Sequence, residues 1–203
     1  MQRTDHPAVT DRTRLHRMPK RGSHDRDVIH AICDEALICH VGFPSARGPV
    51  VIPTTFVRVG DHLYVHGSAA SRMIETLAEG VDACVAITLV DALVLAKSAF
   101  HHSANYRSVV AFGRPRLVED RAEKLAALAA LVDKIEPDRS RACRPPNDKE
   151  LRATSVIELS LAEASAKVRT GGPIDEPEDE GLPYLAGIVP LTTARGPFEP
   201  AAR

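Results

Sequence analysis

The chain has 203 residues, which is enough for one sizeable hydrophobic core and too few for two full domains unless one is very small. Hydrophobic residues at 44% and charged residues at 26% lie near the averages of folded globular proteins, which excludes global disorder and a collagen-like fibre. Because 26 Lys and Arg residues are balanced by 27 Asp and Glu residues, the net charge of -1 gives no general attraction to nucleic acid or anionic lipid.

The cysteines and the N-terminal residues are typical of a cytoplasmic protein. The four cysteines lack C-x-x-C spacing, and three of them lie in apolar runs, where free Cys behaves as a small hydrophobe. Residues 1–30 lack the apolar core of a signal peptide, and no stretch approaches the roughly 20 apolar residues of a membrane span. We therefore expect reduced thiols and no membrane partner.

The first half of the chain predicts antiparallel strands interrupted by two helices. Residues 1–24 have no apolar periodicity and are predicted to be a disordered arm. Apolar positions three and four apart predict a helix over 25–37 and a second one at 73–78, with Gly80 at its end. Runs of β-branched residues separated by turn residues predict strands at 38–43, 50–59, 62–66, 83–89 and 93–96, with a turn at 90–92.

The second half continues this alternation. Residues 106–118 predict a long strand bent at 113–115, and the apolar stripe of 121–135 predicts an amphipathic helix. The remaining segments are, in order, a Pro- and Arg-rich loop at 136–147, a helical turn at 148–152, a strand at 154–161, an acidic loop at 175–180 and a flexible tail at 192–203.

Together these elements predict a mainly β fold with helices (α+β), namely a six-stranded antiparallel barrel over residues 25–191 with helices at its ends. A parallel α/β fold is disfavoured because the strands do not alternate regularly with helices. The sequence also lacks the glycine fingerprints of Rossmann and P-loop nucleotide sites.

The segment from His66 to Arg72 is the sharpest candidate for a binding site. A strand ending at His66 leads through a glycine turn to a helix start that carries Ser68, Ser71 and Arg72. Free backbone N–H groups, two hydroxyls and a guanidinium are donors matched to phosphate oxygens. Judged on spacing alone, the commoner outcome is that Ser68 only caps the helix and Arg72 is solvated.

Several blocks in order along the chain carry a family resemblance. They lie at 49–54, 63–68, 71–72, 98–103, 105–113, 154–156 and 165–169. From about residue 25 to 191 the chain resembles the FMN-binding split-barrel proteins related to pyridoxamine 5'-phosphate oxidase, and more specifically their nitroimidazole-resistance-type branch. The resemblance implies a homodimer with two FMN molecules in clefts between the subunits.

The resemblance also implies roles for individual residues. His66 would lie near the flavin ring and would donate a proton or shape the pocket. The residues implied for cofactor binding are Ser68, Ser71 and Arg72 at the phosphate, Val51, Ile52, Pro53 and Thr54 along the ring, Tyr106, Arg107 and Ser108 in the cleft, and Lys167 nearby. Relatives often carry a C-terminal Trp, whereas this chain has no Trp and offers only Tyr184 there, which leaves the substrate open.

The histidines predict no metal site. On a strand, His62 and His66 would lie about 13 Å apart, too far to bind one ion. His101 and His102 are adjacent, so in an extended chain they point to opposite faces. A serine hydrolase is also disfavoured, because no G-x-S-x-G motif exists.

Two functions follow from these observations. The first is an FMN-dependent oxidoreductase that acts on a small molecule, by reducing a nitro compound or by chemistry like that of pyridoxamine phosphate oxidase. The second is a non-catalytic module that holds flavin, haem or a deazaflavin for sensing, storage or regulation. A haem absorption band would direct attention to His66, His101 and His102.

Overall fold

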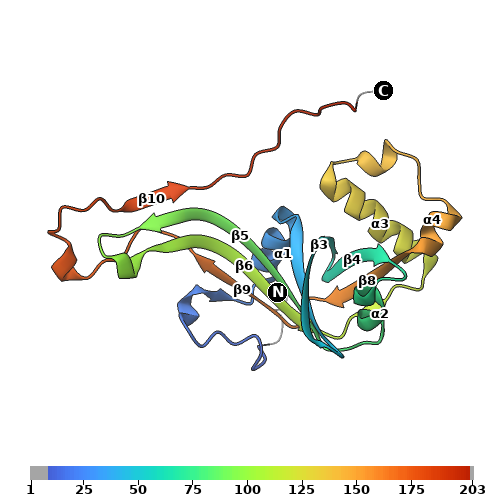
Figure 1. Ribbon diagram of the computed structural model, residues 1–203, viewed down its shortest axis with the longest axis horizontal. Coiled ribbons are helices and arrows are strands. Elements are labelled where there is room, and N and C mark those ends of the chain that lie inside the picture. Colours follow the sequence, from blue (N-terminus) through green and yellow to red (C-terminus); the bar gives the residue numbers. More distant parts are fainter. Residues whose placement is uncertain (1–8, 202–203) are drawn as a thin grey trace, which may run out of the picture. The chain divides into compact units, whose positions relative to one another are not determined.

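The computed structural model of the protein describes residues 9–201 (Figure 1). These residues form two compact units, which are described separately below. The first unit comprises the chain up to Leu89 together with Arg107–Val168. The second comprises Val90–Tyr106 and the chain from Arg169 onward. The ends of the predicted arm and tail, at 1–8 and 202–203, lie outside the described residues.

The secondary structure comprises four α-helices and ten strands among the described residues. The helices are α1 (Arg26–Glu35), α2 (Arg72–Ala78), α3 (Arg121–Ile135) and α4 (Asp148–Ala153), with 3-10 turns η1 (Pro19–Arg21), η2 (Ala99–His101), η3 (Arg139–Arg141) and η4 (Pro177–Asp179). The strands are β1 (Gly22–Ser23), β2 (Ile38–Ser45), β3 (Gly48–Val59), β4 (His62–Ser68), β5 (Ala83–Leu95), β6 (Ser103–Gly113), β7 (Arg116–Leu117), β8 (Thr154–Ser160), β9 (Ala164–Arg169) and β10 (Gly187–Pro190).

The strands form one antiparallel sheet in the order β1-β9-β6-β5-β2-β3-β4-β8-β7, with β10 added beside β5. The sheet is not closed, because β1 and β7 at its two ends are not neighbours. The α+β split-barrel prediction is confirmed, although the described sheet has ten strands where six were predicted. The two-residue strands β1 and β7 are too short to produce a periodic sequence pattern.

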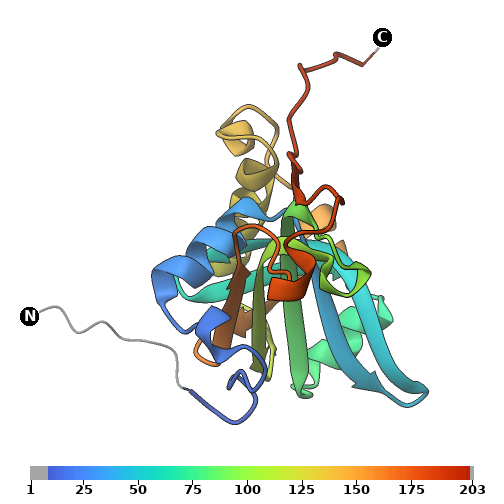
Figure 2. The ribbon, with the colours of Figure 1, turned by 90° about the vertical axis from the view of Figure 1, so that its left-hand side faces the viewer.

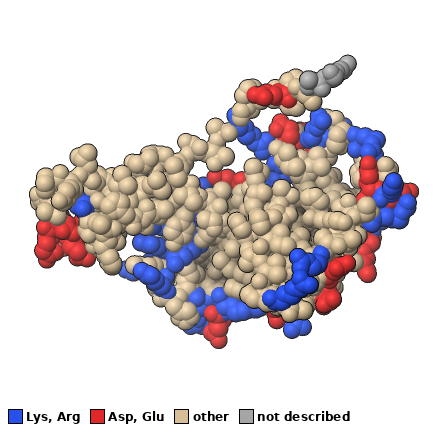
Figure 3. Space-filling view, in the orientation of Figure 1, with Lys and Arg blue, Asp and Glu red and all other residues tan. Residues whose placement is uncertain are grey.

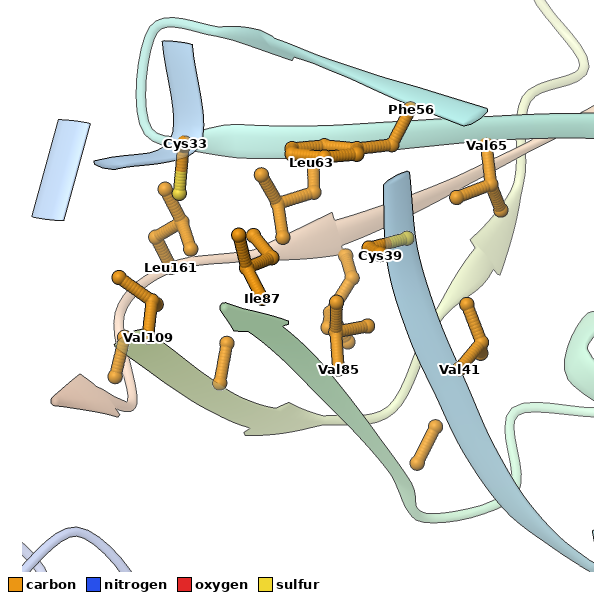
Figure 4. Packing of buried hydrophobic residues seen from close by; sticks show 14 of the residues in the cluster. Cys33, Cys39, Val41, Phe56, Leu63, Val65, Val85, Ile87, Val109 and Leu161 are labelled. Carbon is orange, nitrogen blue, oxygen red and sulfur yellow. The ribbon is translucent and has the colours of Figure 1, made fainter. Parts of the chain in front are cut away.

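The three strands β3, β4 and β8 present two different faces. Alternate residues of a strand point to opposite sides, so Phe56, Leu63 and Val65 enter the main core of the first unit. Figure 4 shows these side chains gathered with those of Cys33 and Cys39. The opposite face carries a second, smaller cluster, which α3 covers with Ala127 and Leu131 and to which the sheet contributes Val57, Tyr64 and Val156.

The helices begin where the sequence supplies capping side chains. Asp25 accepts a hydrogen bond from the backbone N–H of Asp27 at 2.8 Å, and Asp120 accepts one from Glu123 at 2.7 Å. At α4, Asn147 and Glu150 cap each other's backbone N–H groups in a capping box. The predicted helices at 25–37, 73–78 and 121–135 are confirmed within one or two residues at each end.

One local strand prediction is wrong, and a second is wrong only at its start. The predicted turn at 90–92 is part of the continuous strand β5, which lies beside β6 and, from Ala92 onward, also pairs with β10. The predicted strand at 106–118 begins earlier, at Ser103, and its predicted bend at 113–115 is a break between β6 and β7. The break contains Pro115, which has no backbone N–H to donate to a strand ladder.

The chain before Asp25 is tied to the first unit at several points. Gly22 and Ser23 pair with Lys167 and Ala166 of β9, and the Thr13 side chain is buried. The long paired strands β2 and β3 of the same unit are seen in Figure 2.

In the second unit, β10 pairs with β5 and the acidic loop is anchored by Asp175, which accepts hydrogen bonds from the backbone N–H groups of Lys97 and Ser98. Figure 3 shows acidic side chains gathered where this loop lies, at the far left of the view. Within residues 9–201, no helix has the length and apolarity that a transmembrane helix requires.

Candidate functional site

The predicted phosphate-binding residues lie together where β4 ends and α2 begins. Ser68 is the last residue of β4, Ser71 is the N-cap of α2, and Arg72 is the first residue of that helix. We call Ser68, Ser71 and Arg72 the cradle. A larger residue at Gly67 beside it would be crowded, because a Cβ there would lie 3.1 Å from the side chain of Ile74.

The cradle combines local structural bonds with unused donors. Ser68 Oγ accepts from the N–H of Ala70 at 3.3 Å, and Ser71 Oγ accepts from the N–H of Ile74 at 3.3 Å. Ser71 therefore has the N-cap role that spacing alone predicted for Ser68, and Ser68 only accepts a hydrogen bond within the turn. Both hydroxyl protons are still available to an oxyanion. Within residues 9–201, the exposed Arg72 forms no ion pair or side-chain hydrogen bond. The arrangement therefore fits a phosphate group.

A large pocket lies beneath α3 on the outer face of the sheet. Its volume is about 550 Å³, within the range of roughly 300–1,000 Å³ typical of small-molecule and cofactor sites. Helix α3 supplies an apolar wall that includes Leu125, Leu128, Val132 and Ile135. We call this cavity the α3 pocket.

His66 projects from β4 into the lining of the α3 pocket. No other lining residue in the described part of the chain is a histidine. The ring nitrogen Nδ1 is buried and has no hydrogen-bond partner. Buried polar atoms are normally paired, and exceptions gather at functional sites. His66 therefore carries an imidazole whose bonding is incomplete in the chain alone.

The cradle and the α3 pocket meet at the same end of β4. Ser68 lies two residues after His66, so both side chains leave the same face of the strand. In the β4–β8 ladder Ser68 pairs with Thr154, which itself lines the pocket. The backbone N–H of Ala69 also donates to the carbonyl oxygen of Ala153 at 3.0 Å. One local structure therefore positions both features.

The four residues predicted along a flavin ring divide between the two faces of β3. Val51 and Pro53 are exposed, with Val51 at 65%. Ile52 packs against the main core, and Thr54 is half-buried on that same face of the strand. A planar ring on the exposed face would therefore meet the side chains of Val51 and Pro53 and only the backbone of the other two.

The predicted cleft residues are not brought to the cradle within one chain. Arg107 forms an ion pair with Glu35 through two contacts of 2.5 and 2.8 Å, and Ser108 donates to the carbonyl oxygen of Lys167 at 3.3 Å. Strands β5 and β2 separate β6 from β3, a distance of about 14 Å along the sheet. Tyr106 belongs to the second unit.

Sequence reasoning missed the loop that completes the α3 pocket. Ser140 donates to both carboxylate oxygens of Asp133, at 2.7 and 2.8 Å, and these bonds lower the Asp133 pKa. Arg144 binds Glu150 at 2.6 and 3.1 Å, and together with the N–H of Asn147 it lowers the Glu150 pKa to about 2. The only feature of this loop that the sequence shows is its Pro- and Arg-rich composition, which does not predict a pocket.

A partly buried lysine ties α3 to the sheet and to α1. Lys134 donates to the carbonyl oxygen of Cys33 at 2.7 Å and lies 3.6 Å from the centre of the Phe56 ring. Burial lowers its pKa to about 8 and raises the pKa of both Cys33 and Cys39 to about 12. The two cysteines are therefore protonated and inert at neutral pH.

The other histidines considered as metal ligands, namely His62, His101 and His102, have local partners outside the α3 pocket. His62 lies 3.4 Å from the buried carboxylate of Glu158. In the second unit, His101 lies 3.7 Å from Glu176, and His102 Nδ1 is 3.1 Å from the carbonyl oxygen of Ser98. The described residues contain no group of three His, Cys, Asp or Glu side chains that could hold a metal ion.

Comparisons with known proteins place this architecture in a family. The family model described as pyridoxamine 5'-phosphate oxidase matches residues 25–168. No curated protein matches the chain. Among solved structures, the chain is similar to the flavocytochrome Anf3 of Azotobacter vinelandii, with 41% identity over 96% of this chain and 90% of that chain and a TM-score of 0.91.

Two further solved structures support the same assignment. The FAD and haem binding protein of Mycobacterium smegmatis is 36% identical, covers 89% of each chain and has a TM-score of 0.85. A candidate 5-nitroimidazole antibiotic resistance protein of Bacteroides thetaiotaomicron is 25% identical over 72% of this chain and 86% of that chain, with a TM-score of 0.61. The chain therefore belongs to the pyridoxamine 5'-phosphate oxidase-like family of flavin-binding split-barrel proteins.

Proposed function

We propose that this chain is a flavin-dependent oxidoreductase that also binds a haem, with the flavin phosphate in the cradle and the haem in the α3 pocket. The observation that carries the proposal is His66, whose buried Nδ1 lacks a partner in the wall of an apolar pocket of about 550 Å³. The proposal is supported by two similar proteins, which are described as a flavocytochrome and as an FAD and haem binding protein.

The residues present fit both groups. Ser68, Ser71 and Arg72 offer hydroxyl protons and a guanidinium to a phosphate. The α3 pocket offers an apolar wall for a porphyrin, and His66 offers an imidazole as the iron ligand. When bound, the flavin and the haem supply the redox chemistry, while the chain binds them, orients them and excludes water.

The identity of the flavin rests on the cradle. The cradle has donors for a single phosphate group, and FMN carries a single phosphate, so we propose FMN. FAD contains the same phosphate group and is the alternative, because one of the similar proteins is described as binding FAD. Affinity titrations with riboflavin, FMN and FAD separate these outcomes. Equal affinity for riboflavin and FMN would show that the cradle does not hold the phosphate.

We further propose a cytoplasmic homodimer with the cofactor between subunits. The support is the division of the predicted flavin residues into two groups, since Arg107, Ser108 and Lys167 lie on strands that are not neighbours of β3 or β4. A partner subunit would bring the strands that carry this second group close to the cradle of the first, with Arg107 still paired to Glu35. The mass of the purified protein in solution tests this arrangement.

The deciding experiment is an absorbance spectrum of the protein supplied with FMN and haem. We expect flavin bands together with a haem Soret band, and His66→Ala should remove the Soret band while keeping the flavin bands. His62→Ala is the matched control, because His62 lies on the same strand but outside the pocket lining. A Soret band unchanged in His66→Ala would refute the haem assignment.

Turnover separates an enzyme from a binding module. Steady oxidation of NADPH or of reduced flavin with a nitroaromatic acceptor would support the oxidoreductase, whose small-molecule substrate is proposed partly from the likeness to the candidate nitroimidazole resistance protein. Tight cofactor binding without turnover would instead support a role in sensing, storage or regulation.

A further inference from the structure

The second unit buries an arginine that has no carboxylate partner. Arg169 is the last residue of β9 and is 6% exposed. Within residues 9–201 it forms no ion pair, and its hydrogen-bond partners are two neutral oxygen atoms. In the sequence, Lys167 and Arg169 are two basic residues near a strand end, a placement that is more often solvated.

The neutral partners of Arg169 are themselves held in place. One guanidinium nitrogen donates to Oδ1 of Asn105, and the other terminal nitrogen lies 3.4 Å from the carbonyl oxygen of Gly172. Asn105 is 7% exposed, and its amide nitrogen donates to the carbonyl oxygen of Gly171 at 3.0 Å. That bond orients the amide so that its oxygen faces the guanidinium.

Two neutral acceptors do not balance a buried guanidinium. An arginine side chain remains charged in proteins and presents five N–H donors, so it cannot relieve its burial by losing a proton. Burying a charge is strongly unfavourable unless a counter-charge accompanies it. Arg169 therefore has both an unbalanced charge and spare donors.

The turn beside Arg169 is open around its two glycines. A Cβ added at Gly171 or Gly172 would meet no atom within 4 Å. Gly171 also has a φ of 100°, a backbone conformation that residues with side chains rarely adopt. The glycine pair therefore keeps this side of the turn open.

We propose that Arg169 and Asn105 form an oxyanion-binding site, which takes a phosphate or carboxylate group of a small ligand. The guanidinium fork matches two oxygens of such a group, and the ligand would supply the missing negative charge. The site uses none of the cradle residues and does not depend on flavin binding.

Thermal unfolding with inorganic phosphate tests the site. The measurements use Arg72→Gln, because the cradle would also take phosphate. At several times its dissociation constant, phosphate should raise the Tm by about 2–4 °C above a sodium chloride control of equal ionic strength. Adding Arg169→Gln should abolish the rise, whereas adding Arg152→Gln, a change at an exposed arginine, should preserve it.

A second variant keeps the test informative if Arg169→Gln fails to fold. Asn105→Asp, made in the same Arg72→Gln protein, places a carboxylate beside Arg169 and should remove the phosphate-dependent rise by supplying the counter-charge internally. No rise in Arg72→Gln, or a rise that persists after Arg169→Gln or Asn105→Asp, would overturn the proposal. Failure of flavin binding would leave this result unaffected.

The source of the oxyanion is distinguished by comparing FMN with riboflavin in the same proteins. A Tm rise that is larger with FMN than with riboflavin and that depends on Arg169 would place the flavin phosphate at Arg169, and it would overturn a site that is independent of flavin binding. Equal rises with both flavins, together with a response to inorganic phosphate, identify a separate anionic ligand.

Discussion

The cradle and the paired strands β6 and β9 both carry residues predicted to bind flavin, but they use their polar groups differently. Arg72 is exposed and has no ion pair within residues 9–201, and the serine hydroxyls beside it keep a proton to donate. Arg107 is bound to Glu35 through two contacts, and Ser108 is bound to the backbone of Lys167. One group is ready for a ligand, and the other already stabilises the chain.

This difference predicts that substitutions in one group change mainly ligand affinity and that substitutions in the other change mainly the free energy of unfolding. A cation with no protein partner adds little to stability, so its replacement should affect chiefly ligand affinity. A cation with an internal partner should show the reverse, because a ligand must compete with that partner. Comparable substitutions in the two groups therefore produce opposite patterns if the assignment of the cradle is right.

The largest effect is expected at Arg72. Arg72→Gln should weaken FMN binding by about 10- to 150-fold, the equivalent of one charge-assisted contact of roughly 1.5–3 kcal/mol, measured by fluorescence titration. Its unfolding free energy should change by less than about 0.5 kcal/mol, as for most surface substitutions. Arg107→Gln is the matched control and should weaken FMN binding less than about 3-fold.

Equal losses of affinity in the two variants would break the comparison. They would mean that Arg107 leaves Glu35 when the cofactor binds, as an arrangement between two subunits would permit. Unchanged affinity in Arg72→Gln would show that the phosphate lies elsewhere.

The next effect concerns Lys134, a partly buried cation with internal partners. Its pKa is lowered to about 8 in the folded protein, chiefly by burial, from 10.5, so between these values the unfolded chain binds more protons. Stability should therefore rise with pH from about 8 to 10.5 relative to Lys134→Met. After reduction for solvent screening, the relative gain is about 1–2 kcal/mol.

Denaturant titrations of both proteins across this pH range provide the measurement. The raised pKa values of Cys33 and Cys39, each about 12, lower stability at high pH in both proteins, so only the difference between them is informative. A difference that does not change with pH would show that the Lys134 ammonium is better solvated than its contacts imply.

The sequence predicted what local patterns determine. The apolar stripe of 121–135 and the turn after His66 are complete within a few residues, and both α3 and the start of α2 form where predicted. The antiparallel order of the strands from β2 to β4 follows from the short turns between them. These features need no information about distant parts of the chain.

The parts that sequence analysis missed depend on distant partners. The segment 90–92 contains a turn-forming residue, but it lies within β5, which has β6 and β10 as strand neighbours. The sequence of the loop at 136–147 does not indicate a pocket. In the folded chain, the loop is positioned by the bonds of Ser140 to Asp133 and of Arg144 to Glu150. The sequence does not distinguish Arg169 from a solvated arginine, because its burial depends on contacts with Asn105 and with the glycine turn.

The smallest effect tests the other side of the comparison. Glu35→Gln removes the carboxylate that holds Arg107, and because both side chains are partly exposed, at 54% and 29%, the loss of unfolding free energy should be at most about 1 kcal/mol. The loss should shrink in high salt, since an exposed ion pair is screened. If Glu35→Gln also bound FMN more tightly, the released Arg107 would have joined the cofactor site. Glu35 and the cofactor would then compete for the Arg107 guanidinium, and this arginine would serve both folding and binding.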